Sequence, residues 1–378
     1  MVIGYILNWQ RVIIHDYGMT HTLNPIMDRR DFLQRATLGA VALSLPEMPM
    51  LAKDTPMGIV VHSYGFRWNS KTDSKKYPGF INAIDLIDHC HQIGAGGVQV
   101  VVNGWTADFA QKVRAKREQS GLYLEGSIGV PKTAADVPKF EQDVLHAKEA
   151  GAQVLRTVCS AGRRYETYHS AEAFGELKKN ALASLRLAEP ILRKHKVKLA
   201  VENHKDWRAP ELVAMLKQLS SEWIGVTLDF GNSISLLEDP MEVVQTLSPY
   251  VFTTHIKDMA VADYTDGFLL SEVPLGQGIC DLPKMIDLCK KHNPAVTFNL
   301  EMITRDPLQI PCLTADYWST FGDLPGADLA RTLRLVKQHP YKPGLPRTTP
   351  LSPENKLAAE EDNILACLAY GKEKLGLA

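Results

Sequence analysis

Cysteine is scarce in this sequence, and no two cysteines form a C-x-x-C pair. The chain has six cysteines in 378 residues, and none has a partner at the ligand spacing of a zinc finger. A thiolate zinc site built on a local motif is therefore excluded. We interpret the cysteines as scattered, mostly buried thiols; a disulfide remains an alternative whose pairing the sequence does not define.

Neither sign of charge is in excess. Lysine and arginine number 42 against 43 aspartates and glutamates, which gives a formal net charge of −1. A protein that coats nucleic acid or anionic lipid needs a basic stripe to neutralise phosphates, so we expect no nucleic-acid partner. The hydrophobic fraction of 45% and the charged fraction of 22% are ordinary for a globular chain, which excludes disordered and fibrous classes.

Near the N-terminus, a basic segment precedes a short uncharged run. Arg29 and Arg30 come shortly before Phe32 and Leu33, and residues 36–45 carry no charge. These ten residues are too few for a bilayer span, which needs about 20. The order resembles the twin-arginine export motif, and an apolar run behind a basic segment is typical of a signal peptide.

We therefore expect a signal peptide at 27–52, with cleavage near Ala52. The protein would be periplasmic or extracellular, exported already folded, and without a stable membrane anchor after cleavage. Residues 1–26 resemble neither a signal nor a domain, so we expect Met27 to be the true start and 1–26 to be an upstream extension. The alternative is an amphipathic N-terminal helix with two chance arginines.

From residue 57 onward, short β-branched runs alternate with longer helical patterns. The expected strands are 57–63, 98–102, 123–128, 154–158, 197–202, 224–229, 251–255 and 295–301. The expected helices are 80–93, 107–119, 137–150, 171–195, 210–219, 241–247, 282–291 and 327–338. Eight alternations predict an α/β fold, a (β/α)₈ TIM barrel over 57–340. The alternative is an open doubly wound sheet, but no G-x-G-x-x-G follows the first strand.

Two insertions and a tail lie outside the alternation. Residues 259–280 separate the seventh strand from its helix, and 305–325 follow the eighth strand. Both fall where barrel active sites are built, so they are candidate lids. The C-terminal extension 341–378 is rich in proline at first and then helical over 354–375. We expect it to pack around the barrel or against a second subunit of a homo-oligomer.

Four acidic or imidazole residues end four successive expected strands. They are Glu202, Asp229, His255 and Glu301, spaced 27, 26 and 46 residues apart. In a barrel these strand ends are neighbours around one mouth, so three carboxylates and one imidazole would converge. Without a cation they would repel one another and lose hydration. We predict one divalent ion, Mn²⁺ first, with Mg²⁺, Co²⁺ or Zn²⁺ as alternatives. For any single residue the alternative role is a helix N-cap.

Several segments around these residues carry a resemblance to a known family. They are Val201-Glu202-Asn203-His204, Leu228-Asp229-Phe230-Gly231-Asn232, Thr254-His255-Ile256-Lys257-Asp258 and Leu275-Gly276-Gln277-Gly278. Over about 57–338 the chain resembles the xylose isomerase-like TIM barrels, the sugar phosphate isomerases/epimerases. The resemblance implies that Glu202, Asp229, His255 and Glu301 are the metal ligands. It also implies that Glu202 and Glu301 are catalytic and transfer a proton across the substrate.

Asn232 departs from the ketose epimerases of that family, which have a substrate-contacting histidine three residues after the metal aspartate. Asparagine donates hydrogen bonds but does not titrate near neutral pH, which argues against a free-ketose epimerase. Endonuclease IV, a distant member, needs more histidine ligands and a basic surface than this chain has.

Further residues beside the strand ends are candidates for binding a carbohydrate substrate. The substrate candidates are His62, His204, Asn232, Lys257 and Trp105. Each has a structural alternative, such as a satisfied core histidine or a surface lysine. Glu125 is either a residue supporting the site or the partner of an internal salt bridge to Arg156. Arg163-Arg164 either binds a phosphate or carboxylate or forms a solvated face.

The most concrete hypothesis is an exported, metal-dependent sugar isomerase or epimerase. It would act through an enediolate, with Glu202 and Glu301 moving the proton. The first alternative is a lyase or hydratase that uses the same site on a keto-sugar or ketoglycoside. The second is a barrel that binds carbohydrate without turnover.

Overall fold

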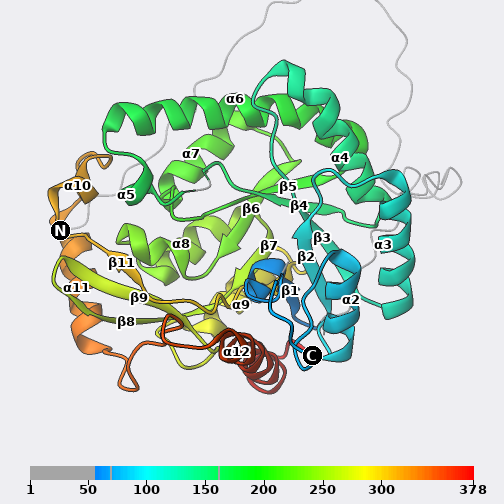
Figure 1. The fold of residues 1–378 in the computed structure, drawn as a ribbon. Helices are drawn as coiled ribbons and strands as arrows, with labels where there is room; N and C mark the ends of the chain where they lie inside the picture. Colours follow the sequence, from blue (N-terminus) through cyan, green and yellow to red (C-terminus); the bar gives the residue numbers. More distant parts are fainter. Residues whose placement is uncertain (1–55, 69, 161) are drawn as a thin grey trace, which may run out of the picture. The chain divides into compact units, whose positions relative to one another are not determined.

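Eight parallel strands close into a barrel in the computed structural model, which describes residues 56–378 except 69 and 161 (Figure 1). Around the barrel the strands are ordered β1-β10-β7-β6-β5-β4-β3-β2. They are β1 (Gly58–Val60), β2 (Gly97–Val101), β3 (Tyr123–Ser127), β4 (Val154–Thr157), β5 (Lys198–Glu202), β6 (Ile224–Asp229), β7 (Val251–Ile256) and β10 (Thr297–Leu300). The predicted TIM barrel is confirmed. The predicted signal peptide at 27–52 and the extension 1–26 lie outside the described residues.

Helices connect successive strands and surround the barrel. The main ones are α2 (Ala83–Gln92), α3 (Ala107–Ser120), α4 (Val137–Glu149), α6 (Ala171–His195), α7 (Ala209–Leu219), α8 (Pro240–Leu247), α9 (Leu282–His292) and α11 (Gly326–Gln338). Their starts follow capping chemistry, because Thr106, Ser170 and Asp239 accept backbone N–H groups at the first turns of α3, α6 and α8. From α2 to α9, the helices bury apolar side chains against the barrel strands, most of whose residues are themselves buried on both faces.

The first strand is shorter than predicted. It ends at Val60, and η1 (Val61–Tyr64) follows as a 3₁₀ turn that places His62 at the mouth.

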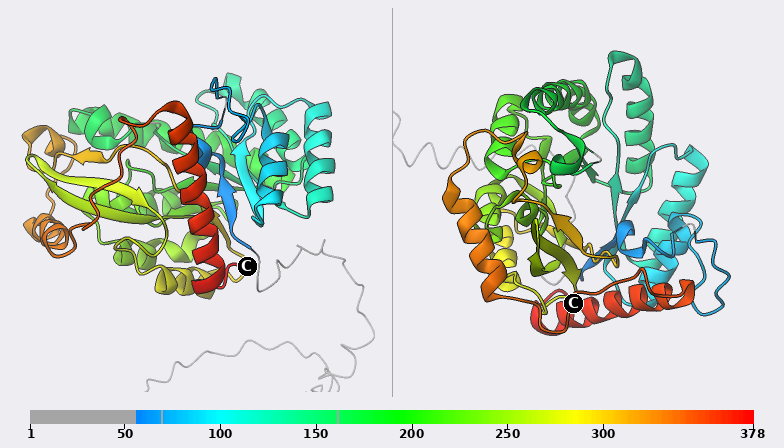
Figure 2. Two further views of the ribbon diagram at one scale, coloured as in Figure 1. Left: turned by 60° about the horizontal axis from the view of Figure 1, so that its bottom comes forward. Right: turned by 60° about the vertical axis from the view of Figure 1, so that its left-hand side comes forward.

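The two insertions form a structure that the sequence did not predict. β8 (Asp258–Tyr264), β9 (Gly267–Val273) and β11 (Leu308–Ile310) make an antiparallel sheet in the order β11-β9-β8. This sheet buries a second apolar cluster together with α11 and the short helix α10 (Ala315–Trp318), beside the barrel (Figure 2). The two insertions, which the sequence suggested as lids, therefore form a packed sheet with an apolar core of its own.

The C-terminal helix α12 (Pro353–Lys374) packs against the barrel near η1. The Glu360 carboxylate accepts the backbone N–H groups of Phe66 (2.6 Å) and Arg67 (2.9 Å). Glu361 pairs with Arg67 (2.7 Å) and His89 (3.0 Å). In the described part of the chain, no helix has the length and apolarity to cross a membrane.

Candidate metal centre

The four predicted ligands converge at the mouth of the barrel. Glu202, Asp229 and His255 lie on β5, β6 and β7, and Glu301 follows β10 directly. Their nearest ligand atoms all lie within 4.8 Å of one another, and all four side chains are buried. In the barrel order β5 and β10 are the outer strands of these four, so the two glutamates flank Asp229 and His255.

Hydrogen bonding fixes which nitrogen of His255 faces the cluster. Its Nε2 lies 2.7 Å from Gln99 Oε1, a carbonyl oxygen that accepts, so Nε2 carries the proton. Nδ1 has no hydrogen-bond partner among the described residues and lies 3.4 Å from Glu301 Oε1 and 3.6 Å from Glu202 Oε2. A nitrogen lone pair facing carboxylate oxygens is unfavourable unless a metal ion or a second ring proton lies between them.

The electrostatics of the cluster point the same way. Burial alone lowers the pKa of His255, but the carboxylates of Glu301 and Glu202 raise it above its ordinary value. The centre of the cluster therefore favours a positive charge. Three carboxylates and one imidazole nitrogen form a donor set that suits Mn²⁺, Mg²⁺, Co²⁺ or Zn²⁺, so the residues fit a divalent ion.

Both flanking glutamates are held ionised. Glu202 accepts from Arg156 Nε (2.6 Å) and from Asn232 Nδ2 (2.9 Å). Burial alone would raise the pKa of Glu202, but Arg156 and His255 lower it to about 2. Burial acts in the same way on Glu301, where Lys257 and His255 hold the pKa well below its ordinary value. Both carboxylates are therefore charged at neutral pH, as a ligand or a base must be.

Lys257 lies among the ligands. Its Nζ is 2.7 Å from Asp229 Oδ2 and 3.3 Å from Asn232 Oδ1, and it also donates to Glu301 Oε2. Burial lowers the pKa of Lys257, but Asp229 and Glu301 outweigh this and raise it. Lys257 is therefore a charged counter-ion of two ligands.

A polar chain supports the imidazole from inside the barrel. Gln99 Nε2 donates to Glu125 Oε2 (2.9 Å), and Glu125 also accepts from Thr253 (2.8 Å) and Asn299 (3.1 Å). Burial raises the pKa of Glu125. The internal salt bridge between Glu125 and Arg156 is not formed, because Arg156 pairs with Glu202 instead.

A tight turn holds the end of β7 in place. The carboxylate of Asp258, at the start of β8, accepts the backbone N–H groups of Gly276 (3.0 Å), Gly278 (2.9 Å) and Cys280 (3.1 Å). A Cβ on Gly278 would lie 2.2 Å from Asp258 Oδ1, so the turn approaches too closely for a side chain. The turn thereby fixes the chain one residue after Lys257.

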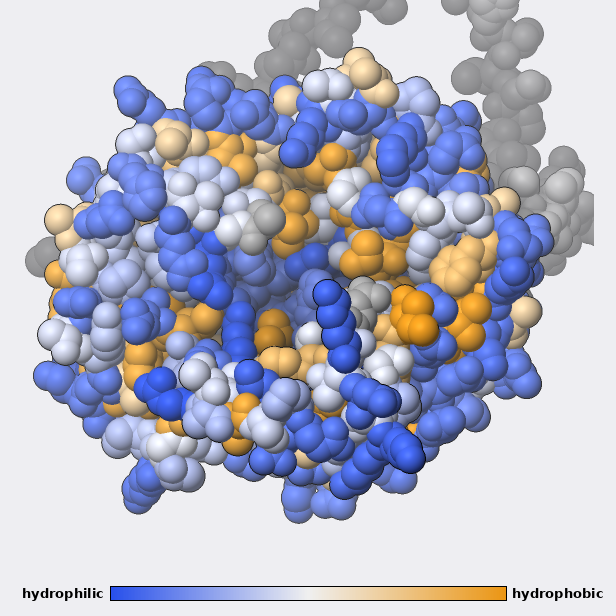
Figure 3. Space-filling model, viewed as in Figure 1, coloured by the Kyte–Doolittle hydropathy of each residue, from blue (hydrophilic) through white to orange (hydrophobic). Residues whose placement is uncertain are grey.

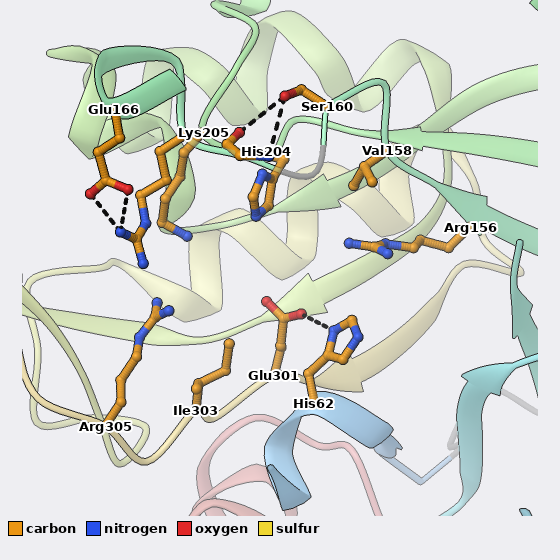
Figure 4. A pocket seen from close by; sticks show the side chains of 12 residues that line it. His62, Arg156, Val158, Ser160, Glu166, His204, Lys205, Glu301, Ile303 and Arg305 are labelled. Carbon is orange, nitrogen blue, oxygen red and sulfur yellow. Dashed lines mark hydrogen bonds and ion pairs between the residues drawn. The ribbon is translucent and has the colours of Figure 1, made fainter. Parts of the chain in front are cut away.

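A cavity of about 470 Å³ opens beside the cluster, and of the four cluster residues Glu301 lines it. It is lined by His62, Arg156, Val158, Ser160, Gly162, Arg163, Glu166, His204, Lys205, Glu301, Ile303 and Arg305. The surface of this face is hollowed at its centre, where hydrophilic residues gather (Figure 3). Figure 4 shows Glu301 and His62 in contact, with Nδ1 of His62 3.2 Å from Glu301 Oε1.

Residues 87–332 match the family model of the xylose isomerase-like TIM barrel. The chain belongs to this family. A curated relative is the 3-oxo-isoapionate decarboxylase of Pectobacterium atrosepticum, 25% identical over 231 residues, which are 60% of this chain and 78% of the relative. A second is the uncharacterised protein YihM of Escherichia coli, 23% identical over 62% of this chain and 68% of that protein.

Solved xylose isomerase-like barrels share the fold at low sequence identity. A Mycobacterium smegmatis protein crystallised with magnesium is 15% identical, with a TM-score of 0.51 over 74% of this chain and 97% of that chain. A D-psicose 3-epimerase from Clostridium cellulolyticum, crystallised with D-tagatose, is 11% identical, with a TM-score of 0.51 over 75% and 97%. These two likenesses establish the fold alone.

The predicted substrate residues of this xylose isomerase-like barrel differ in whether they line the cavity. His62 and His204 line the cavity, and burial together with Lys205 lowers the pKa of His204 to about 3. Asn232 is buried between the cluster and two lysines. Trp105 is not among the lining residues; it packs edge-on against Phe109 at 5.3 Å between ring centroids.

Sequence reasoning missed Lys205, Arg305 and Gln99. Lys205 and Arg305 follow Glu202 and Glu301 by three and four residues, in the loops after β5 and β10. Their position after a ligand-bearing strand was an available signal. Of the Arg163-Arg164 pair, Arg163 lines the cavity, while Arg164 is buried and pairs with Glu211 (2.8 Å).

Proposed function

We propose that this protein is a divalent-metal-dependent isomerase or epimerase that moves a proton beside a carbonyl group of a carbohydrate. The observation that carries the proposal is the buried cluster of Glu202, Asp229, His255 and Glu301, in which the Nδ1 of His255 faces carboxylates without a hydrogen-bond partner in the described chain. These four residues would hold the ion, and we propose Mn²⁺ first. The bound ion would supply Lewis-acid stabilisation to negative charge on substrate oxygens.

The two flanking glutamates would carry the proton. One, ionised, removes it from the carbon next to the carbonyl, which leaves an enediolate. The other, after taking a proton from solvent, returns that proton at a neighbouring carbon or on the other face. Arg156 supports this role for Glu202, and Lys257 supports it for Glu301, because each cation keeps its carboxylate ionised and oriented. His62, in contact with Glu301, would orient a substrate hydroxyl beside it.

A lyase is the second candidate, and the identity of Asn232 favours it. Ketose epimerases of this family resemble the chain but have a substrate-contacting histidine here, whereas an amide does not titrate near neutral pH, and this one is held by Glu202, Lys257 and Lys205. The same enediolate chemistry could then end in the loss of a leaving group. The decarboxylase among the relatives supports this reading as well.

Incubation in D₂O with Mn²⁺ and a panel of ketoses, keto-sugar acids and ketoglycosides tests the proposal. Isomerisation or epimerisation gives an isomer of the substrate in which one hydrogen has been replaced by deuterium from the solvent. In a lyase reaction the substrate instead loses water, an aglycone or CO₂. Glu301→Gln should lower turnover by about 100-fold or more, the usual size of general-base catalysis. The exposed Glu176→Gln on α6 is the matched control. Carbohydrate binding without any product would instead favour a non-catalytic barrel.

We also propose that the protein is exported by the twin-arginine route. The Arg29-Arg30 pair and the uncharged run 36–45 support this location.

A further inference from the structure

Lys205 is a buried cation that the proposed chemistry does not use. It lies in the loop between β5 and α7 with only 3% of its surface exposed. Among residues 56–378 without 69 and 161, no carboxylate oxygen lies within 4.0 Å of its Nζ, and its hydrogen-bond partner is the neutral amide oxygen of Asn232. Lysine is almost never buried without a counter-charge, because its ammonium group loses hydration.

The neighbours of Lys205 add positive charge. Lys257 donates to the same amide oxygen of Asn232, at 3.3 Å. Arg305 lines the same cavity, and Glu272 of the inserted sheet accepts hydrogen bonds from its Nε (3.1 Å) and from a second guanidinium nitrogen. Burial and the charges of Lys257 and Arg305 together lower the pKa of Lys205 to about 8, although Glu272 and Asp229 act in the opposite direction. A negative group beside Nζ would relieve this excess.

The charges of the metal cluster and Lys205 support the same conclusion. Glu202, Asp229 and Glu301 are three negative charges, and Arg156 and Lys257 neutralise two of them. A divalent ion on the proposed ligands leaves the cluster with one positive charge, and Lys205 adds a second. A neutral sugar would leave both uncompensated, whereas an anionic substrate that forms an enediolate would balance them.

The geometry separates two ends of the cavity. In Figure 4, Lys205 and Arg305 lie on one side, Arg156 and His62 lie on the other, and Glu301 stands between them. A substrate whose carbonyl lies over the metal ligands therefore reaches Lys205 with one end of its carbon chain.

We propose that the substrate is an acidic sugar derivative whose anionic end group, a carboxylate or a phosphate ester, binds Lys205 beside Arg305. This proposal names the substrate class of the metal centre and rests on the function proposed above. Arg305 is already held by Glu272, so Lys205 is the main binding group and Arg305 strengthens it through charge.

Calorimetric titration of the full chain with three related polyols tests this proposal. D-glucitol is neutral, D-gluconate carries a carboxylate at one end, and D-glucitol 6-phosphate carries a phosphate. With Mn²⁺ present, we expect at least one of the two anions to bind about 10- to 100-fold more tightly than D-glucitol, as for hydrogen bonds to charged groups. Whichever anion binds more tightly identifies the source of the charge.

Lys205→Met should abolish the preference for the anion and leave the affinity for D-glucitol unchanged. Lys205→Arg should retain most of the preference, and the exposed Lys112→Met on α3 should retain all of it. In the unaltered protein, added salt should weaken anion binding selectively, which tests the proposal even if the variants fold poorly. Equal affinity for D-glucitol and both anions, no binding of either anion, or a preference that survives Lys205→Met would overturn the proposal.

Parallel titrations with Mn²⁺ alone separate this inference from the proposed function. Mn²⁺ binding without any preference for an anion would contradict the acidic substrate and leave the metal centre intact. A preference for an anion without Mn²⁺ binding would contradict the metal-dependent function and leave the role of Lys205 intact.

Discussion

Divalent ions should stabilise the folded barrel, and removing two of the ligands should abolish the effect. An ion that binds only the native state at 100 times its Kd adds about 2.7 kcal/mol to the free energy of unfolding. With an unfolding entropy of about 2.1 cal/mol/K per residue over the described chain, this is a rise in Tm of about 4 °C. We expect this rise with Mn²⁺ and, at other concentrations, with Mg²⁺, Co²⁺ or Zn²⁺.

The double variant Asp229→Ala/His255→Ala should show no rise in Tm with any of the four ions. A matched control is Asp316→Ala/His169→Ala, which removes the same residue types from an exposed pair with an N–O distance of 3.1 Å. Differential scanning fluorimetry measures Tm, and elemental analysis counts the bound metal, expected at about one ion per chain. A rise that persists in the double variant, or none in the unaltered protein with any ion, would refute the metal centre.

Three further predictions concern stability and export. Burial raises the pKa of Glu360 to about 7, so the folded state keeps a proton that the unfolded state releases above about pH 4.5. The contribution of this group to stability is therefore present at low pH and lost, by about 3 kcal/mol, as the pH rises to 7. Urea titrations at several pH values should show that Glu360→Gln removes this decrease in the free energy of unfolding. An unchanged pH dependence in the variant would contradict the assignment. Gly278→Ala should destabilise the protein by about 1–3 kcal/mol because its Cβ has no room, whereas Gly322→Ala, with no atom within 4 Å, should have little effect in the same assay. Replacing both Arg29 and Arg30 with lysine should retain the protein in the cytoplasm, and unchanged export on fractionation would exclude the twin-arginine route.

The barrel strands were predictable because a parallel strand buried on both faces is a continuous run of apolar and β-branched residues. Residues 224–229 are an example, and every one of them is buried. The hairpin of β8 and β9 was missed because only Lys257 separates β7 from β8, so the sequence resembles one strand end followed by a loop. β11 has three residues, which is too short for any periodicity.

The spacing of the strands predicted that the four ligands converge, but it did not predict which residues form hydrogen bonds and ion pairs with them. Glu125 and Arg156 lie on neighbouring strands, which made a salt bridge plausible. In the register, however, Arg156 pairs with Ser127, so Glu125 lies two residues deeper in the barrel, and Arg156 reaches Glu202 on its other neighbour, β5. Lys205 escaped prediction because a loop lysine is ordinarily solvated, and only the fold shows that this one is buried.

The link from Glu125 through Gln99 to His255 has a direction, because an amide has a donor end and an acceptor end. The Glu125 carboxylate accepts a hydrogen bond from the amide nitrogen of Gln99, so the amide oxygen is the atom that faces His255 and accepts its hydrogen bond. The proton on the imidazole is thereby confined to Nε2, and Nδ1 keeps its lone pair for the mouth. A carboxylate on β3 thus decides which atom of β7 is ready to bind a cation, without approaching the cation itself.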